Sequence, residues 1–453
     1  MKNLWLRFLH WSYCRTGRWG WIAARRIRPL GWGVSVLAVV SAVLGTDILK
    51  SSVFVVFATS TALWSISFIT VFFRSAKIFA SRELPQVASV GEEVHFTVTA
   101  QNRSKHRLRA ALLEEWPPNP NPTLEEFSHS PEPGEEQRNP VDRTFLFYRW
   151  MWLQEQKRGF TDFEATEYLD VEGNATAKVQ LRFTPTQRGL LRFSEMRVRL
   201  PDPFGLFQRC ARVQAETDPL IVLPKRYPLG DLLHLGQSRL HLGGDIASNR
   251  TGQTGDFLHL RDYRPGDPIR SLDWKSWART GTPVVREYED SFFPRFGLIL
   301  DTTGPVGAIF EEAVSVAASF VSALDTEESL IDLLFIRDQA YRVTAGRGVA
   351  KPIRLLEALA SVQANGRDSL EDLSALCKRH HKQLEACIAI FPGWNAPRAA
   401  FASQLRSQIE ELHLIILGDE STLELNPPAD ALLLNPKNVA LSLQQLNRQL
   451  ARS

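Results

Sequence analysis

The pattern of hydrophobic and polar residues divides the chain into segments with different expected structures. Residues 31–49 are apolar except for Asp47, and residues 53–73 are apolar without any charge. Each run is long enough to cross the roughly 30 Å hydrocarbon core of a bilayer. We therefore predict two transmembrane helices within residues 31–75, joined as a hairpin. A signal peptide is the alternative for the first run, but no small-residue cleavage site is evident and a second apolar run follows at once.

The first 30 residues carry seven basic side chains and no acidic one, with four tryptophans between them. This composition is typical of an amphipathic segment at a membrane surface. Three more basic residues follow the second apolar run, whereas the turn between the runs carries one acidic and one basic residue. The positive-inside rule therefore predicts that both termini lie in the cytoplasm.

Between residues 82 and 224 the pattern changes to short runs in which apolar and polar residues alternate. Alternation with period two, with turn residues between the runs, indicates antiparallel strands and a small β-sandwich over 82–224. Residues 117–166 interrupt this pattern, since they are first Pro-rich and acidic and then aromatic. We interpret them as an insertion that either binds a partner or packs on its own domain. Asp202-Pro203-Phe204-Gly205 fits a type I turn.

Beyond residue 290, apolar runs alternate with segments of helical periodicity. The expected strands are 296–301, 330–336, 340–345, 386–391 and 412–417. Alternating strands and helices predict a mainly parallel, doubly wound sheet, and so an α/β domain over residues 291–453. Residues 225–290 form a linker of uncertain structure that ends in a densely charged motif.

This motif, from Gly255 to Asp290, interleaves charged and aromatic residues more densely than any other part of the chain. Its six basic and seven acidic residues are nearly balanced. A phosphate-binding patch would be one-sidedly basic, so nucleic acid is not an expected partner. The charges lie among apolar side chains, where an unpaired charge is costly. We therefore predict a partly buried network that contains Arg270, Asp273 and Arg279.

A turn followed by a short helix is expected inside the motif. Pro265 and Gly266 suit the central positions of a turn, Asp267 suits the helix N-cap and Pro268 suits the first helical position. The network and the turn together give two interpretations of the motif. It is either purely structural or it presents a surface to a partner or ligand.

The run GDFLHLRDYRPGDPIRSLDWKSWAR resembles the hallmark of the bacterial domain-of-unknown-function 58 family. That hallmark consists of a Gly-x-Phe, an Arg-x-Tyr-x-x-Gly-Asp, an Arg-x-x-Asp-Trp and an Ala-Arg in this order. The matching residues are Arg261, Tyr263, Gly266, Asp267, Arg270, Asp273, Trp274 and Arg279. The sequence Asp-Pro-Phe-Gly-Leu-Phe at 202–207 also resembles an element that the family carries before its main motif.

The resemblance implies a membrane-anchored N-terminus and a von Willebrand factor A-like domain after the motif. In that fold the first metal-site loop reads Asp-x-Ser-x-Ser, because a cation such as Mg²⁺ prefers hydroxyl and carboxylate oxygens. Asp301 and Thr303 match this loop, but Pro305 replaces its second hydroxyl. Pro392-Gly393 stands where the last metal-site aspartate is expected. We therefore expect a degenerate remnant at Asp301 and Thr303, with no bound metal and no other cofactor.

Composition adds constraints on domain number and chemistry. At 453 residues the chain exceeds one core, and 44% apolar and 23% charged residues with a net charge of +3 are ordinary for a folded protein. The four cysteines are far apart and form no CxxC pair, which favours reduced thiols in a cytosolic environment. No nucleophile elbow, HExxH or phosphate loop is present. We therefore predict no catalytic residue.

The resemblance implies an interaction or adaptor protein rather than an enzyme. The resemblance implies that the protein is a partner of a MoxR-type AAA+ ATPase. The two proteins would act together in chaperone-like maturation or assembly of protein complexes. The expected partners are such an ATPase and the lipid bilayer, and the expected location is the bacterial inner membrane, crossed twice. The alternative is a membrane-bound hydrolase that uses the charged motif over residues 256–279.

Overall fold

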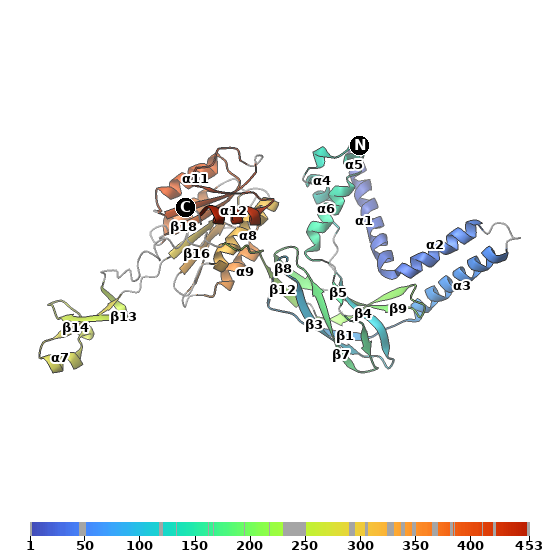
Figure 1. Ribbon diagram of the computed structural model, residues 1–453, viewed down its shortest axis with the longest axis horizontal. Helices are drawn as coiled ribbons and strands as arrows, with labels where there is room; N and C mark the ends of the chain where they lie inside the picture. The colour runs from blue at the N-terminus through green and yellow to red at the C-terminus, as the bar shows by residue number, and fades with distance from the viewer. Residues whose placement is uncertain are drawn as a thin grey trace. The chain divides into compact units, whose positions relative to one another are not determined.

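The computed structural model of the protein divides into two compact units, Met1–Pro224 and Lys225–Ser453. Together they form a multidomain arrangement of helices and sheets (Figure 1). The residues that the structure describes are 2–44, 51–116, 121–132, 134–161, 163–165, 167–193, 195–216, 218–229, 251–289, 295–303, 307–323, 330–336, 340–346, 350–364, 370–380, 384, 386–409, 411–419 and 423–450. Most of the predicted linker before the charged motif lies outside this set.

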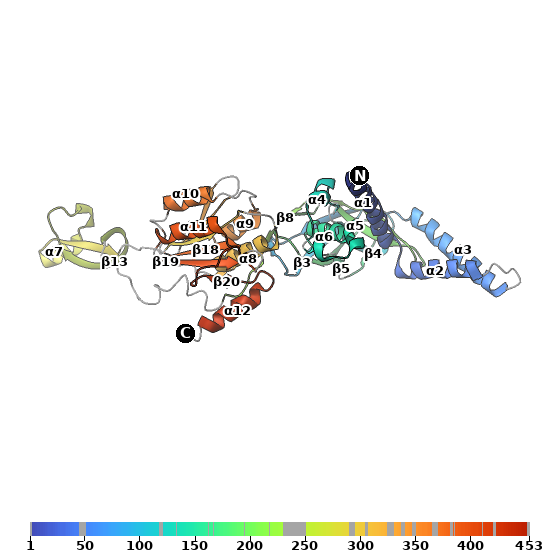
Figure 2. The ribbon, with the colours of Figure 1, turned by 90° about the horizontal axis from the view of Figure 1, so that it is seen from above.

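Three helices open the first unit: α1 (Lys2–Arg26), α2 (Pro29–Leu44) and α3 (Ser51–Phe73). By length and composition α3 is suited to cross a membrane, whereas the apolar helix α2 is shorter, with 16 residues. The two helices lie side by side (Figures 1 and 2), and the Trp64 indole donates a hydrogen bond to the Ser35 hydroxyl at 3.1 Å. Among the described residues, one helix is therefore long and apolar enough to span a membrane. The first predicted span, over residues 31–49, extends beyond α2 into residues 45–50, which lie outside the described residues.

The rest of the first unit is built mainly from β-strands. These are β1 (Ile78–Glu83), β2 (Val87–Ser89), β3 (Val94–Asn102), β4 (Leu108–Trp116), β5 (Glu164–Ala165), β6 (Leu169–Val171), β7 (Thr176–Phe183), β8 (Gly189–Phe193), β9 (Glu195–Pro201), β10 (Gln208–Arg212), β11 (Gln214–Ala215) and β12 (Asp218–Leu223). Their sheets have the orders β11-β1-β3-β7-β5, β10-β9-β4-β6 and β2-β12-β8. The described pairs are antiparallel except β1 with β11 and β2 with β12.

The alternating sequence pattern explains how these sheets share one core. In β3, for example, Val94, Phe96, Val98 and Ala100 are buried and the residues between them are more exposed. Successive side chains of a strand point to opposite faces, so period-two hydrophobicity buries one face only. Buried residues from all three sheets belong to a single hydrophobic cluster.

The predicted insertion folds into short helices: α4 (Leu124–His129), η1 (Glu135–Gln137), α5 (Pro140–Phe145) and α6 (Phe147–Arg158). Thr123 and Glu126 form a capping box that begins α4, each side chain binding the other's backbone N–H. Leu9 of α1 shares a buried cluster with Phe127, Trp150 and other insertion residues. The insertion therefore covers one face of the N-terminal helix.

In the second unit, β13 (Thr251–Asp262) and β14 (Val284–Glu289) form an antiparallel hairpin. Its loop contains η3 (Ile269–Ser271) and α7 (Trp274–Thr280). A six-stranded sheet follows, with the order β17-β16-β15-β18-β19-β20. Its strands are β15 (Arg295–Leu300), β16 (Leu330–Ile336), β17 (Ala340–Gly346), β18 (Ala386–Pro392), β19 (Glu411–Leu417) and β20 (Leu432–Leu434). All neighbours are parallel except β17, which runs antiparallel to β16.

Helices flank this sheet: α8 (Ala308–Ala323), α9 (Ile353–Ser361), α10 (Glu371–His380), α11 (Ala396–Arg406) and α12 (Val439–Leu450). Figure 2 shows α10 and α11 on one face and α12 on the other. The central strands are buried on both faces, as their continuous apolar runs predict.

Candidate functional site

The β13–β14 hairpin holds the family-like motif, and an arginine–carboxylate pair fastens its turn. Arg261 on β13 donates from both Nη atoms to the two oxygens of Asp267, each at 2.8 Å. The same carboxylate accepts the backbone N–H of Arg264 at 2.8 Å. Gly266 has a φ of +110°, in the left-handed region that glycine tolerates best. The contact with Arg261, followed by the backbone hydrogen bond, lowers the pKa of Asp267 to about 2.

A second carboxylate joins the turn region to the opposite strand. Asp273 caps α7 by accepting the Lys275 backbone N–H at 3.2 Å, and it binds Arg286 of β14 at 3.1 Å. Its own N–H donates to the Val284 carbonyl at 2.9 Å. The hydrogen bond from Arg286 is the main reason that the pKa of Asp273 lies below its usual value. The hairpin, its turn and its helix therefore form one braced element.

One prediction for this motif is wrong. Asp267 is not a helix N-cap, because its side chain turns back to Arg261, while Asp273 caps the helix that follows. Arg286, which the predicted network did not include, binds Asp273. The predicted partners Arg270 and Arg279 are both exposed, on η3 and α7. Arg286 reaches this carboxylate because β14 folds back beside the loop, where the Asp273 N–H donates to the Val284 carbonyl.

Two apolar side chains of the motif, Ile269 and Trp274, lie at the surface. Ile269 is 68% exposed and Trp274 is 59% exposed. The Trp274 ring stacks on that of Trp277, with centroids 5.3 Å apart. Tyr263 is half-buried, and its N–H donates to the Pro283 carbonyl. Exposed apolar side chains that gather on a braced element are typical of interaction surfaces.

The charges of the hairpin are poorly suited to acid–base chemistry. Asp267 and Asp273 both have lowered pKa values and both bind an arginine. Near neutral pH such carboxylates carry no proton to donate, and their stabilised charge makes them weak bases. The geometry favours a structural brace that presents other side chains.

The second candidate site lies where β15 ends, beside β18. The connections from these two strands leave in opposite directions, and open α/β sheets bind ligands at such a point. Asp301 follows β15 and is fully buried. Its Oδ1 accepts the Thr303 backbone N–H at 2.8 Å and the Thr303 hydroxyl at 2.6 Å. Pro305 lies outside the described residues.

Arg398, in the first turn of α11, places its guanidinium group beside Asp301 and so supplies the positive charge at this site. Its Nε donates to the other oxygen of Asp301 at 2.7 Å, and its Nη2 donates to the Thr303 carbonyl at 3.1 Å. Asn395 begins α11 by accepting the Arg398 backbone N–H, which places the arginine beside the carboxylate. The Arg398 side chain is only 11% exposed. Sequence reasoning missed Arg398, for which the N-cap signal of Asn395 was the available clue.

These residues do not fit a metal ion of the von Willebrand type. Protein donors already hold both oxygens of Asp301, and the guanidinium neutralises its charge. In the part of the chain that the structure describes, no group of three His, Cys, Asp or Glu side chains is arranged to hold a metal. The counterion of the Asp301 carboxylate is therefore the Arg398 side chain.

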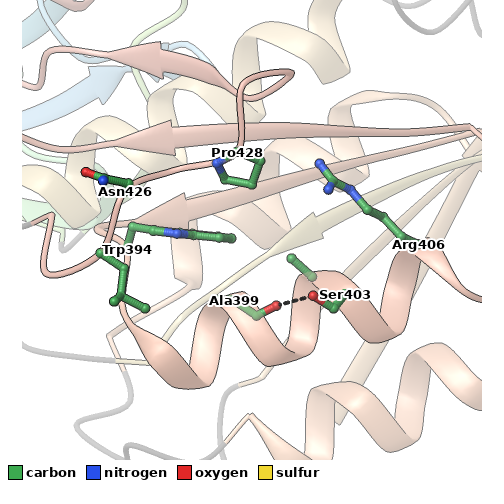
Figure 3. Close-up of a pocket in the computed structure, with 8 residues that line it drawn as sticks. Trp394, Ala399, Ser403, Arg406, Asn426 and Pro428 are labelled. Carbon is green, nitrogen blue, oxygen red and sulfur yellow. Dashed lines mark hydrogen bonds between the residues drawn. The ribbon is translucent and has the colours of Figure 1, made fainter.

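A pocket of about 420 Å³ lies between α11 and the segment before β20 (Figure 3). It is lined by Trp394, Ala399, Ala402, Ser403, Arg406, Leu425, Asn426 and Pro428. Arg406 is the charged side chain of this lining, and it is already paired with Asp430 at 2.6 Å. The lining therefore offers little chemistry to a ligand.

Comparison with known proteins supports the family resemblance of the motif, but the matches cover only part of the chain. The family described as "Protein of unknown function DUF58" matches residues 259–391, from the hairpin to β18. "Uncharacterized protein YeaD" from Bacillus subtilis (strain 168) is 29% identical over 140 residues. That alignment covers 30% of this chain and 33% of the relative, so the chain matches about a third of the relative's length.

Solved structures add no information on fold or function. A GH20 exo beta-N-acetylglucosaminidase from Vibrio harveyi, in complex with N-acetylglucosamine, matches with 11% identity and a TM-score of 0.17. This match covers 83% of this chain and 71% of that one. A family 123 glycoside hydrolase from Clostridium perfringens matches with 10% identity, 82% and 71% coverage and a TM-score of 0.13. Similarities this weak carry no argument.

Proposed function

We propose that the protein is a membrane-anchored interaction protein that works with a MoxR-type AAA+ ATPase in chaperone-like assembly or maturation of protein complexes. The observation that carries this proposal is the pair of exposed side chains Ile269 and Trp274 on the braced hairpin. Exposed tryptophan is among the residues that contribute most to binding energy at protein interfaces. The partial match to the uncharacterised family is consistent with this role, and no observation favours the hydrolase alternative.

The braces matter because binding is costly when a surface must first become ordered. Arg261 with Asp267, and Arg286 with Asp273, hold the turn and α7 before any partner arrives. Lys275 and Arg279 are exposed on the same helix as Trp274. A partner groove that is apolar in its centre and acidic at its rim would complement this surface.

We place the protein at the bacterial inner membrane with two crossings and with cytoplasmic termini. The length and apolar composition of α3 support anchoring, and the apolar α2 beside it supports a hairpin of two spans. We interpret the three sheets around one core as a β-sandwich. The order of the six-stranded sheet, with its antiparallel edge strand β17, supports a von Willebrand factor A-like domain.

The proposal is tested by nucleotide-dependent binding of the full-length protein, in detergent or nanodiscs, to the MoxR-type ATPase of the same organism. Trp274→Ser should weaken binding roughly tenfold or more, as for a central interface tryptophan. Leu441→Ser is the matched control, because Leu441 is exposed on α12. Both variants should keep the wild-type unfolding temperature. Equal binding by all three proteins would exclude the hairpin as the interface, and no binding by the wild type would refute the ATPase as partner.

A further inference from the structure

Helix α1 is apolar on two opposite faces, and the described residues of the first unit cover one of them. On the covered face Leu9 is buried, and the Tyr13 hydroxyl donates to the Phe145 carbonyl at 2.7 Å. His10 Nε2 lies 2.9 Å from the Pro122 carbonyl oxygen. These contacts fasten α1 to α4, α5 and α6 of the insertion. The covered face therefore behaves as an ordinary core face.

The opposite face of α1 is also apolar and is exposed. Leu4, Phe8 and Trp11 follow the i, i+4, i+7 spacing that places residues on one side of a helix with about 3.6 residues per turn. Each is more than half exposed. Trp5 stacks on Phe8 at 5.8 Å and meets Phe145 of α5 at 6.0 Å, and Phe8 lies 6.4 Å from Trp11. These five residues form one continuous surface, the aromatic stripe.

Basic side chains flank the aromatic stripe. Arg7 and Arg15 are exposed on α1, and the Arg15 guanidinium lies 5.3 Å from the centre of the Trp11 ring. Residues 1–30 contain no acidic side chain. Aromatic rings with neighbouring arginines are the combination that favours the headgroup region of a bilayer with anionic lipids. An apolar groove on a protein partner would bind the aromatic rings but would not require the neighbouring arginines, whereas anionic lipid headgroups bind both.

The position of α1 within the first unit also favours a bilayer. The corner between α1 and α2 is held by hydrogen bonds from the Arg28 N–H to the Leu206 carbonyl at 2.9 Å and from Gln208 Nε2 to the Arg25 carbonyl at 2.7 Å. Helix α1 runs across the direction of α2 and α3, and α4 and α6 lie on the side of α1 away from that pair (Figures 1 and 2). The uncovered face therefore points to the side on which α2 and α3 extend.

We infer that the aromatic stripe lies on the surface of a bilayer with anionic headgroups, and that the insertion holds α1 in that plane. The inference rests on the proposed anchoring by α3, since a spanning α3 sets the headgroup plane at the base of α1. The inference also assigns a role to the insertion. The insertion packs against the covered face of α1, so that the aromatic stripe on the opposite face remains available to lipid.

The test places a photo-crosslinking phenylalanine analogue at single positions of the full-length protein in nanodiscs. Position 8 reports on the aromatic stripe, and position 69, where Ile69 is exposed on α3, reports on the span. Position 125, where Glu125 is exposed on α4, is the control on the covered side of α1. Lipid adducts are measured by mass spectrometry in phosphatidylcholine with and without phosphatidylglycerol.

Lipid adducts are expected at positions 8 and 69 and not at position 125. Phosphatidylglycerol should raise the yield at position 8 several-fold and leave position 69 unchanged, and Arg15→Gln should reverse this rise. Adducts at position 69 without any at position 8, or a protein crosslink at position 8, would overturn the inference and leave the anchoring intact. No adduct at position 69 would overturn the anchoring itself, and this inference with it.

Discussion

At the residue scale, the counterion of Asp301 decides what the carboxyl edge of the six-stranded sheet can bind. A buried carboxylate needs a partner charge, and Arg398 provides one from the same chain at 2.7 Å. A divalent cation would have to displace this guanidinium and leave it buried without its partner. Such a state is strongly unfavourable, because an unpaired buried charge costs several kcal/mol.

Breaking this pair should destabilise the second unit. Asp301→Ala or Arg398→Ala should each lower the free energy of unfolding by roughly 3–5 kcal/mol, because each leaves one buried charge unpaired. The double variant should lose less than the sum of the two, since residues in direct contact are coupled. Urea unfolding of the full-length protein, followed by hydrogen exchange of β15 and α11, measures both effects.

Arg406 on the same helix provides the control for this prediction. Its pair with Asp430 is exposed, so Arg406→Ala should change the free energy of unfolding by only about 0–1 kcal/mol. Titration calorimetry with Mg²⁺ and Mn²⁺ supplies the contrary outcome. A stoichiometric cation site in the wild type that disappears in Asp301→Ala would show that Arg398 does not replace the metal.

At the element scale, the turn at residues 202–207 links β9 to β10 and contacts helices α2 and α3. The Asp202 carboxylate accepts the backbone N–H groups of Phe204 at 2.9 Å and Phe207 at 2.8 Å, which holds the turn in shape. The Phe207 ring meets the ring of Trp64 on α3 at 5.2 Å. Gly31 of α2 packs against the Leu206 carbonyl, where an added Cβ would collide with backbone. The turn is therefore a docking point for α2 and α3.

Gly31→Ala should loosen this docking point. The methyl group has no space beside a backbone carbonyl, and overpacking of this kind typically costs about 1–3 kcal/mol. The expected result is a lower unfolding temperature and faster hydrogen exchange in residues 200–208. Gly33→Ala is the matched control, because a Cβ there meets open space and alanine favours helices. Equal exchange in the two variants would contradict the role of Gly31.

At the scale of the whole molecule, the number of membrane crossings decides where the two units lie. Basic residues flank the apolar helices on both sides, and the connecting turn carries little charge. The proposed cytoplasmic location of both termini requires an even number of crossings, and therefore requires α2 to cross as well as α3. A helical segment of about 20 residues is needed for each crossing.

Reporter fusions test this topology directly. Reporters placed at the N-terminus, after Arg82 and after Ser453 should all indicate the cytoplasm, because positively charged flanks remain on that side. A periplasmic signal after Arg82 or Ser453 would contradict the predicted orientation. A periplasmic N-terminus with the other two reporters in the cytoplasm would show that α3 crosses alone.

The sequence by itself determined the elements whose signals are local. The uncharged apolar run of α3, the period-two alternation of β3 and the continuous apolar runs of the parallel sheet follow from the spacing of neighbouring residues. The turn at Asp202 likewise needed only four adjacent residues, and its hydrogen bond from the Gly205 N–H to the Asp202 carbonyl is present.

Only the tertiary structure decided which charges pair and which apolar faces are covered. Asp301 lies 97 positions from Arg398, and Asp273 lies 13 positions from Arg286, so no local spacing indicates either pair. Trp274 remains exposed because, within the described residues, the hairpin has two strands and no second layer that covers the tryptophan. The insertion covers one face of α1, although the two segments are far apart in the sequence. Burial and charge pairing depend on such distant segments, which only the folded chain brings together.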